Sequence, residues 1–170
     1  MVKPQTNYAF IDGQNVNLSV RAMGWNLNFS RFRVYLSEKY GVGRAYYFIG
    51  YIPGNNDLYI SLQLAGFILV FKPTMQLISG KVKGNCDAEL VLQAMADFKE
   101  YKKAVIVTSD GDFACLVDYL RTRDKLSCVL ASSYGGCSHL LKQAAGNKIA
   151  FMDNLKGKLE YKKRKKKRTP

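Results

Sequence analysis

The sequence predicts an α/β fold in which helices flank a mostly parallel central sheet. Short apolar runs rich in β-branched and aromatic residues alternate with helical stretches of about ten residues, which is the pattern of βαβ units. Several runs are apolar throughout, as expected for parallel strands that are buried on both faces. The chain has 170 residues, of which 48% are hydrophobic, so it is the size of a single domain with one core.

In the first half of the chain we expect three strands, at residues 7–11, 44–49 and 67–71. The first strand ends in an Asp-Gly-Gln-Asn turn, and residues 17–21 can form a helical turn after it. A helix is expected to follow Ser30, its predicted N-cap, and to run to Tyr40. Another helix is expected at residues 57–65, where Gly66 closes it.

The second half begins with a long irregular connection at residues 72–85, which contains Lys81 and Lys83. Apolar residues then recur at helical spacing over residues 87–99. Strands are expected at residues 104–107, 126–130 and 148–152, with helices at 113–123 and 138–145 between them. We therefore assign residues 1–154 to one domain and residues 155–170 to a basic, disordered tail.

The net charge of +13 is large for this length, and seven of those charges lie in the unbroken run from Lys162 to Arg168. The rest of the chain is still basic, at +6. A basic body attracts polyanions, so the composition favours a nucleic-acid partner. The simplest interpretation of the run itself is a solvated tail, although its charge raises non-specific affinity for RNA or DNA.

Cysteine and histidine give little support to a zinc site, because the four cysteines have no Cys-x-x-Cys spacing and His139 is the only histidine.

No apolar run approaches the ~20 residues needed to span a bilayer, so no membrane role is expected. Without a signal-like apolar region at residue 1, we expect a cytoplasmic protein with reduced thiols. The sequence leaves the oligomeric state open, a homodimer included.

Four aspartates are predicted to meet at one edge of the sheet. Asp12 follows the first strand, Asp110 and Asp112 follow the strand at 104–107, and Asp87 opens a helix. The carboxyl ends of parallel strands share the edge where α/β sheets bind their ligands. Crowded carboxylates repel one another unless a cation lies between them, and Mg²⁺ or Mn²⁺ prefers such oxygen ligands. These ions promote phosphodiester cleavage.

Nearby polar residues suit the same chemistry. Asn15 lies one turn beyond Asp12 and can position substrate, and Thr108 or Ser109 can hydrogen-bond a carboxylate or a phosphate. Structural explanations also exist: Asp12 before a glycine is typical of a turn, Asp112 can cap a helix, and Asp87 matches a helix dipole. The chain has nine aspartates, and the placement of four at one predicted edge favours a shared site.

Three segments carry a specific resemblance: Phe10 to Asn15, Lys83 to Asp87 with its helix, and Val107 to Phe113. In order and spacing they resemble the signature motifs of the NYN domain family, in the PIN-like nuclease superfamily. The resemblance implies a Rossmann-like PIN fold over about residues 7–153. It also implies an RNA substrate and a divalent-metal ribonuclease site of Asp12, Asp87, Asp110 and Asp112, with Asn15 beside them.

The leading hypothesis is a metal-dependent endoribonuclease in which Lys81, Lys83, Asn15 and Ser109 contact substrate. The alternative is a non-catalytic RNA-binding or regulatory protein that uses its charge, with aromatic residues such as Tyr46, Tyr51, Tyr59 and Trp25 available to stack on bases, although such residues more often belong to the core. A DNA nuclease is a third hypothesis, because the same metal chemistry serves both polymers. Dinucleotide-binding and phosphate-loop folds are disfavoured, since neither glycine-rich motif is present in its required context.

Overall fold

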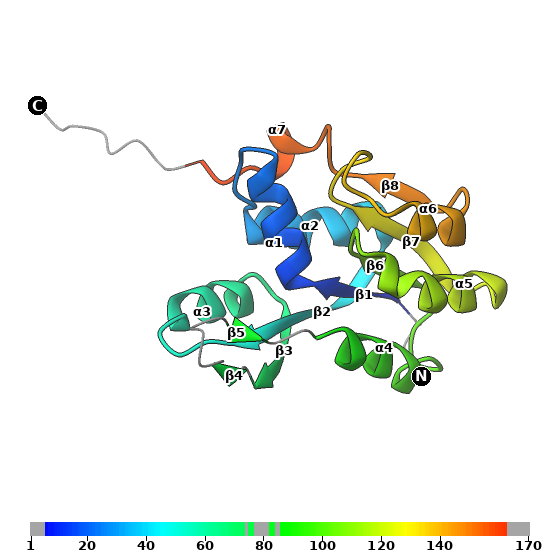
Figure 1. Ribbon diagram of the computed structural model, residues 1–170, viewed down its shortest axis with the longest axis horizontal. Coiled ribbons are helices and arrows are strands. Elements are labelled where there is room, and N and C mark those ends of the chain that lie inside the picture. Colours follow the sequence, from blue (N-terminus) through cyan, green and yellow to red (C-terminus); the bar gives the residue numbers. More distant parts are fainter. Residues whose placement is uncertain (1–5, 74, 77–81, 84–85, 163–170) are drawn as a thin grey trace, which may run out of the picture.

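The computed structural model describes residues 6–73, 75–76, 82–83 and 86–162 (Figure 1). Within these residues six strands form one parallel sheet, in the order β3-β2-β1-β6-β7-β8. The strands are β1 (Asn7–Asp12), β2 (Val42–Tyr51), β3 (Ile68–Pro73), β6 (Ala104–Val107), β7 (Leu126–Ala131) and β8 (Ile149–Phe151). The predicted α/β fold and parallel sheet are therefore confirmed. A separate antiparallel pair joins β4 (Met75–Gln76) to β5 (Val82–Lys83).

Helices cover both faces of the sheet, as Figure 1 shows. They are α1 (Gly13–Ala22), α2 (Phe29–Tyr40), α3 (Asn56–Leu64), α4 (Asp87–Ala96), α5 (Ala114–Thr122), α6 (His139–Ala145) and α7 (Lys156–Leu159). The first three and α7 pack on the face that includes Ile11, and the other three pack on the face that includes Phe10. In the described part of the chain, no helix is both long and apolar enough to cross a bilayer.

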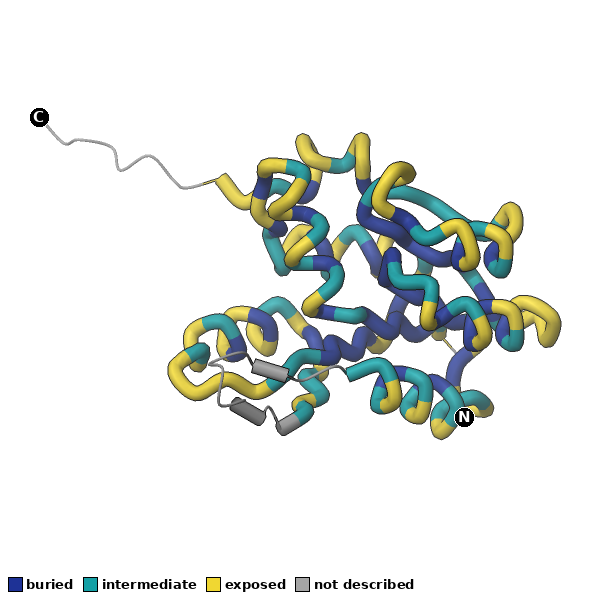
Figure 2. The backbone as a smooth tube through the Cα atoms, viewed as in Figure 1, coloured by how far each residue is buried: buried dark blue, intermediate teal, exposed yellow. Residues whose placement is uncertain are grey.

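The alternation of side chains along β1 explains why both faces need cover. Tyr8 and Phe10 point into one hydrophobic cluster, while Ala9 and Ile11 point into the other, and all four are buried. The same burial extends through β6, whose four residues are all inaccessible to solvent. Figure 2 shows this as a buried central layer between helices with exposed outer surfaces. The apolar runs in the sequence therefore correspond to central strands.

The order of the strands creates a switch point beside β1. The chain moves outward from β1 through β2 to the edge strand β3, and then returns to place β6 on the other side of β1. Connections from β1 and β6 consequently leave in opposite directions, which opens a crevice at their carboxyl ends. The residues that follow β1 and β6 are those that the sequence assigns to the site.

Gly13 allows the chain to turn directly from β1 into α1. A methyl group on Gly13 would collide with the Tyr47 ring and would lie 2.7 Å from the Phe48 carbonyl oxygen. The Tyr47 hydroxyl donates a hydrogen bond to the Gly13 carbonyl oxygen at 3.4 Å, so the same ring also holds the turn. The close approach of β2 therefore requires glycine at this position.

Several predicted boundaries differ from those in the structure. Helix α1 is a full ten residues, rather than a turn at 17–21, because the Asp12 side chain caps it. Helix α2 is capped by Asn28, whose Oδ1 accepts the Arg31 N–H, so the predicted Ser30 cap is wrong. Helix α4 ends at Ala96 instead of residue 99, and a 3₁₀ turn, η1 (Gly111–Phe113), precedes α5.

The packed chain extends past residue 154, the predicted end of the domain. Leu159 of α7 is 1% exposed and belongs to the cluster beneath α1 and α2. Glu160 forms an antiparallel bridge with Leu27, the Asn28 N–H donates to the Leu159 carbonyl oxygen, and the Tyr161 N–H donates to the Asn26 carbonyl oxygen. Residues 163–170 of the predicted tail lie outside the described residues.

Substitution of Gly13 by alanine tests how tightly β2 and α1 are packed. We expect Gly13→Ala to lower the free energy of unfolding by ~2 kcal/mol or more, because the Tyr47 ring or the backbone must move. The control is Gly157→Ala in α7, where an added methyl would meet no atom within 4 Å. Urea denaturation measures both variants. Equal stability of the two variants would contradict the predicted collision.

Candidate functional site

Asp12 lies at the junction of β1 and α1 and is fixed by two hydrogen bonds. Its Oδ1 accepts the Asn15 N–H at 3.2 Å, and its Oδ2 accepts the Thr108 hydroxyl at 3.1 Å. Thr108 is fully buried at the end of β6, and its Oγ1 also accepts the Asp110 N–H at 3.2 Å. One threonine therefore links the Asp12 carboxylate to the backbone that positions Asp110.

Asn15 provides a second connection between the two strand ends. Its Oδ1 accepts the Ser109 N–H at 2.9 Å, so its side-chain oxygen is engaged within the protein. The Asn15 side chain still lines the cleft described below, where its amide N–H₂ is the remaining polar group. The prediction that Asn15 contacts substrate is thus compatible with its position, but its first role is to hold the two turns together.

Ser109 is placed differently from the prediction. It is 5% exposed, its Oγ accepts the Ser132 N–H at 3.0 Å, and its carbonyl oxygen accepts the Ser138 N–H at 3.0 Å. Ser109 does not line the cleft, so the predicted contact with substrate receives no support from the structure. Instead it fixes the turn after β6 against the segment that leads into α6.

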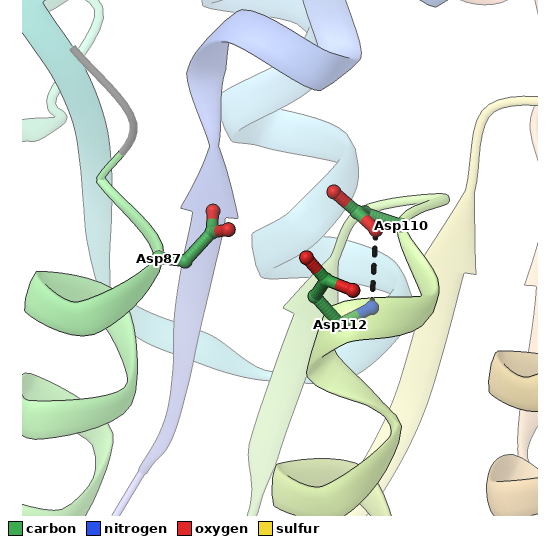
Figure 3. Close-up of side chains that lie close together, drawn as sticks. All are labelled: Asp87, Asp110 and Asp112. Carbon is green, nitrogen blue, oxygen red and sulfur yellow. Dashed lines mark hydrogen bonds between the residues drawn. The ribbon is translucent and has the colours of Figure 1, made fainter.

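Three carboxylates converge at the edge of the crevice. One oxygen of each of Asp87, Asp110 and Asp112 lies within 4.8 Å of the others. Figure 3 shows Asp87, from the start of α4, facing Asp110 and Asp112, which lie on the turn after β6. The Asp110 Oδ1 accepts the Asp112 N–H at 3.0 Å, which orients the Asp110 carboxylate. Two of the three are partly buried, and Asp112 is exposed.

Asp12 is adjacent to this group but is not one of the three. It forms, with Asp87, Asp110, Gln14, Asn15 and Leu18, the lining of a cleft of about 270 Å³. The structure therefore brings the four predicted aspartates to the same edge of the sheet, where Asp12, Asp87 and Asp110 are partly buried and Asp112 is exposed. Gln14 and Leu18 were not predicted from the sequence, where their only signal is the four-residue spacing that places both on one face of α1.

Burial and the neighbouring carboxylates disfavour the charged form of Asp12. The pKa of Asp12 rises from 3.8 to about 6, mainly because the carboxylate is buried; its bonds to Asn15 and Thr108 lower the pKa, and the charges of Asp87 and Asp110 add to the rise. The Cys86 thiol lies beside these carboxylates and carries no charge that could offset theirs. Burial and the Glu89 carboxylate raise the pKa of that thiol to about 11, so it stays protonated at neutral pH.

Lys72 is a cation near the site that the sequence analysis did not assign. Its Nζ lies 3.2 Å from the Glu89 Oε1, and its charge also acts on the Cys86 thiol, next to Asp87. The sequence predicts that Lys72 starts an irregular connection, but it belongs to β3 and emerges at the same edge.

Lys81 lies outside the described residues, and only the backbone of Lys83 is described, so their predicted phosphate contacts stay predictions.

An all-oxygen cluster of this size fits a hard divalent cation. Two oxygens bound to one ion lie at most about 4.2 Å apart across Mg²⁺ and about 5 Å apart across Ca²⁺, so a group of oxygens within 4.8 Å of one another is close to the size of one divalent site. The described residues offer neither histidine nor an ionised thiol within this group. The residues present therefore match Mg²⁺ or Mn²⁺ better than Zn²⁺.

The fold and the acidic cluster define the class of protein: a Rossmann-like α/β domain with a candidate metal site at its switch point. Comparison with known families then identifies the family. The model of the NYN domain matches residues 8–152, and the chain therefore belongs to the NYN domain family, a PIN-like nuclease family. This confirms the resemblance that the three sequence motifs carried.

A solved structure supports the fold independently. The chain is similar to a crystal structure of a protein of unknown function from Vibrio parahaemolyticus RIMD 2210633, with a TM-score of 0.73 and 23% sequence identity. The match covers 91% of this chain and 97% of that one, so the architecture is shared almost end to end. No curated protein matches the chain.

The raised pKa of Asp12 makes stability depend on pH. Between its unfolded value of 3.8 and its folded value of about 6, the folded state binds the proton more tightly. Stability from this group is therefore complete below pH ~4 and is lost as the pH rises through about 6. In EDTA we expect a loss of ~2 kcal/mol in unfolding free energy between pH ~4 and pH ~7.5.

Urea denaturation in EDTA at several pH values measures this loss. Asp12→Asn, which keeps an acceptor for the Asn15 N–H, should flatten the pH dependence and be more stable than wild type at pH ~7.5. Asp118→Asn is the matched control, because Asp118 is an exposed acid on α5 and should retain the wild-type slope. A wild-type slope in Asp12→Asn would show that Asp12 does not carry the effect.

Proposed function

We propose that the protein is a divalent-metal-dependent endoribonuclease that hydrolyses phosphodiester bonds of single-stranded RNA. The observation that carries the proposal is the convergence of Asp87, Asp110 and Asp112, beside Asp12, at the switch point of a NYN domain. The net charge of +13 adds the attraction that a polyanionic substrate requires.

In this proposal Asp87, Asp110 and Asp112 hold Mg²⁺ or Mn²⁺, because their oxygens are close enough to share it. Such a cation, when bound, lowers the pKa of water and offsets negative charge on a phosphodiester. Asp112 is the most exposed of the three, which leaves the solvent side of the cluster open to a substrate phosphate.

Asp12 is proposed to accept a proton from water in the cleft that it lines. Its pKa of about 6 keeps the carboxylate ionised at neutral pH while matching the working range of a general base. Thr108 and the Asn15 N–H fix its two oxygens, so the carboxylate presents its remaining lone pairs in a fixed direction. Asn15 and Lys72 are proposed to contact the substrate phosphate from opposite sides.

Cleavage of a labelled single-stranded RNA tests the proposal directly. With Mn²⁺ or Mg²⁺ we expect cutting by wild type and none in EDTA. Asp110→Asn keeps the side-chain size but removes the charge, and should reduce the rate beyond the ~10–100-fold typical of outer-shell substitutions at metal sites. Asp118→Asn, which removes a distant ion-paired acid, should cut as wild type does.

The outcomes of this assay separate the competing functions. RNA that is bound but never cut by wild type, with any of the metals, would favour the non-catalytic RNA-binding protein. Equal cutting of a DNA of the same sequence would contradict the assignment of RNA as the substrate class. Cutting by Asp110→Asn at the wild-type rate would overturn the proposed site.

The basic run that begins at Lys162 is proposed to contribute affinity without sequence preference. Deletion of residues 162–170 should weaken RNA binding and reduce the slope of log K against log salt by ~0.7 for each phosphate that the run neutralises. Fluorescence anisotropy at several salt concentrations measures the slope. An unchanged slope would exclude the run from the RNA interface.

A further inference from the structure

A second, larger cleft lies beside the acidic one. It has a volume of about 530 Å³, within the ~300–1,000 Å³ of small-molecule sites, and it is bounded by α1, the start of α2, α3 and Tyr161. Most of the residues that line it are polar, among them Arg21, Asn26, Asn28, Ser30, Asp57 and Tyr161. None of these residues belongs to the acidic cluster.

One exposed face of α1 joins the two clefts. Gln14 and Leu18 line the acidic cleft, and Asn17 and Arg21 line the second one. These four residues are spaced by three and four positions, so they follow one another along a single face of the helix. From Gln14 to Arg21 the helix rises ~10 Å. Leu18, which is 60% exposed, provides an apolar surface between the clefts.

Arg21 offers a guanidinium to the second cleft. Within the described part of the chain no hydrogen bond or ion pair involves that guanidinium, although Asp57 lines the same cleft. A guanidinium at the rim of a polar cleft suits a phosphate, which it can bind in a bidentate manner. Asp57 repels phosphate, so the anion should lie on the α1 side and bases toward α3.

Tyr161 is held at the rim of the cleft by backbone contacts. Its N–H donates to the Asn26 carbonyl oxygen at 2.8 Å, and the adjacent Glu160 is bridged to Leu27. Buried Leu159 anchors the preceding turn. Tyr161 is nevertheless 55% exposed. An exposed ring on a fixed backbone is suited to base stacking.

We infer that this second cleft is an RNA subsite for nucleotides adjacent to the phosphate held at the acidic cleft. Tyr161 stacks on a base, Arg21 contacts a phosphate, and base edges are contacted by the Asn26 amide and by the side-chain N–H₂ of Asn28, whose Oδ1 already caps α2. The strand follows the exposed face of α1 between the clefts. The inference rests on the proposed function because it takes the acidic cleft as the place where the RNA is cut. The binding contacts in the second cleft do not depend on catalysis.

Binding of a fluorescein-labelled dodecauridine in EDTA, measured by anisotropy, tests the subsite without cleavage. Tyr161→Ala should bind at least about tenfold more weakly, as expected when one base no longer stacks on an aromatic ring, while Tyr161→Phe should bind as wild type does. Arg21→Gln should weaken binding about fivefold and reduce the salt slope by ~0.7. Arg31→Gln is the matched control, since Arg31 is an exposed arginine on α2 outside the cleft.

Cleavage in Mn²⁺ then compares the dodecamer with a dinucleotide, whose single phosphodiester bond cannot lie at the acidic cleft and at Arg21 together. Tyr161→Ala should raise KM for the dodecamer about tenfold and leave cleavage of the dinucleotide unchanged. Thermal denaturation confirms that each variant is folded. Tyr161→Ala and Arg21→Gln that bind the dodecamer as tightly as wild type would overturn the subsite, as would the absence of saturable RNA binding by wild type.

The two proposals fail in different ways. If wild type does not cut RNA but binds it through Tyr161 and Arg21, the nuclease is wrong and the subsite stands. If wild type cuts RNA and both variants bind and cut the dodecamer normally, the nuclease stands and the subsite is wrong.

Discussion

The hydrogen bonds between the ends of β1 and β6 are the contacts on which the site depends. Thr108 ties the Asp12 carboxylate to the backbone of Asp110, and Asn15 ties α1 to the Ser109 N–H. Because the strands are neighbours only through the reversal of strand order, these bonds join segments 94 to 96 residues apart in sequence. Without them the turns that carry the acids would be held by strand pairing alone, which ends at Val107.

The charge of Asp12 in this arrangement lowers the stability of the folded state, and this loss of stability indicates a functional site. Asp12 is partly buried beside Asp87 and Asp110, so its charged form is disfavoured and its pKa rises to about 6. A sequence selected for stability alone would have an amide or an apolar residue at the position of Asp12. Perturbed carboxylates gathered in a cleft are typical of functional sites, where a bound cation offsets the repulsion. The hydrogen bonds to Asp12 reduce this cost without removing it.

The sheet could be predicted from the sequence because its strands are buried on both faces and therefore read as continuous apolar runs. Start points of helices were less predictable. Residues 13–17 contain glycine and two asparagines, which are poor helix formers, yet the Asp12 cap and buried Val16 and Val20 overcome this. The side-chain direction of Ser109 is set by Ser132 from another strand end, which no local pattern encodes. The packing of Leu159 among lysines likewise depends on distant residues.

A centre made of carboxylates repels the polyanion that it is proposed to cut, so binding free energy has to come from outside the acidic cleft. A single cation among four acids leaves net negative charge there, and phosphate attraction must be supplied by Lys72, Arg21 and the general positive charge of the chain. Stacking on Tyr161 is insensitive to that repulsion, because it acts on the base rather than on the phosphate. In the proposed arrangement, the second cleft binds the RNA strand through Tyr161 and Arg21, away from the four acids, and the adjoining phosphate then lies at the acidic cluster.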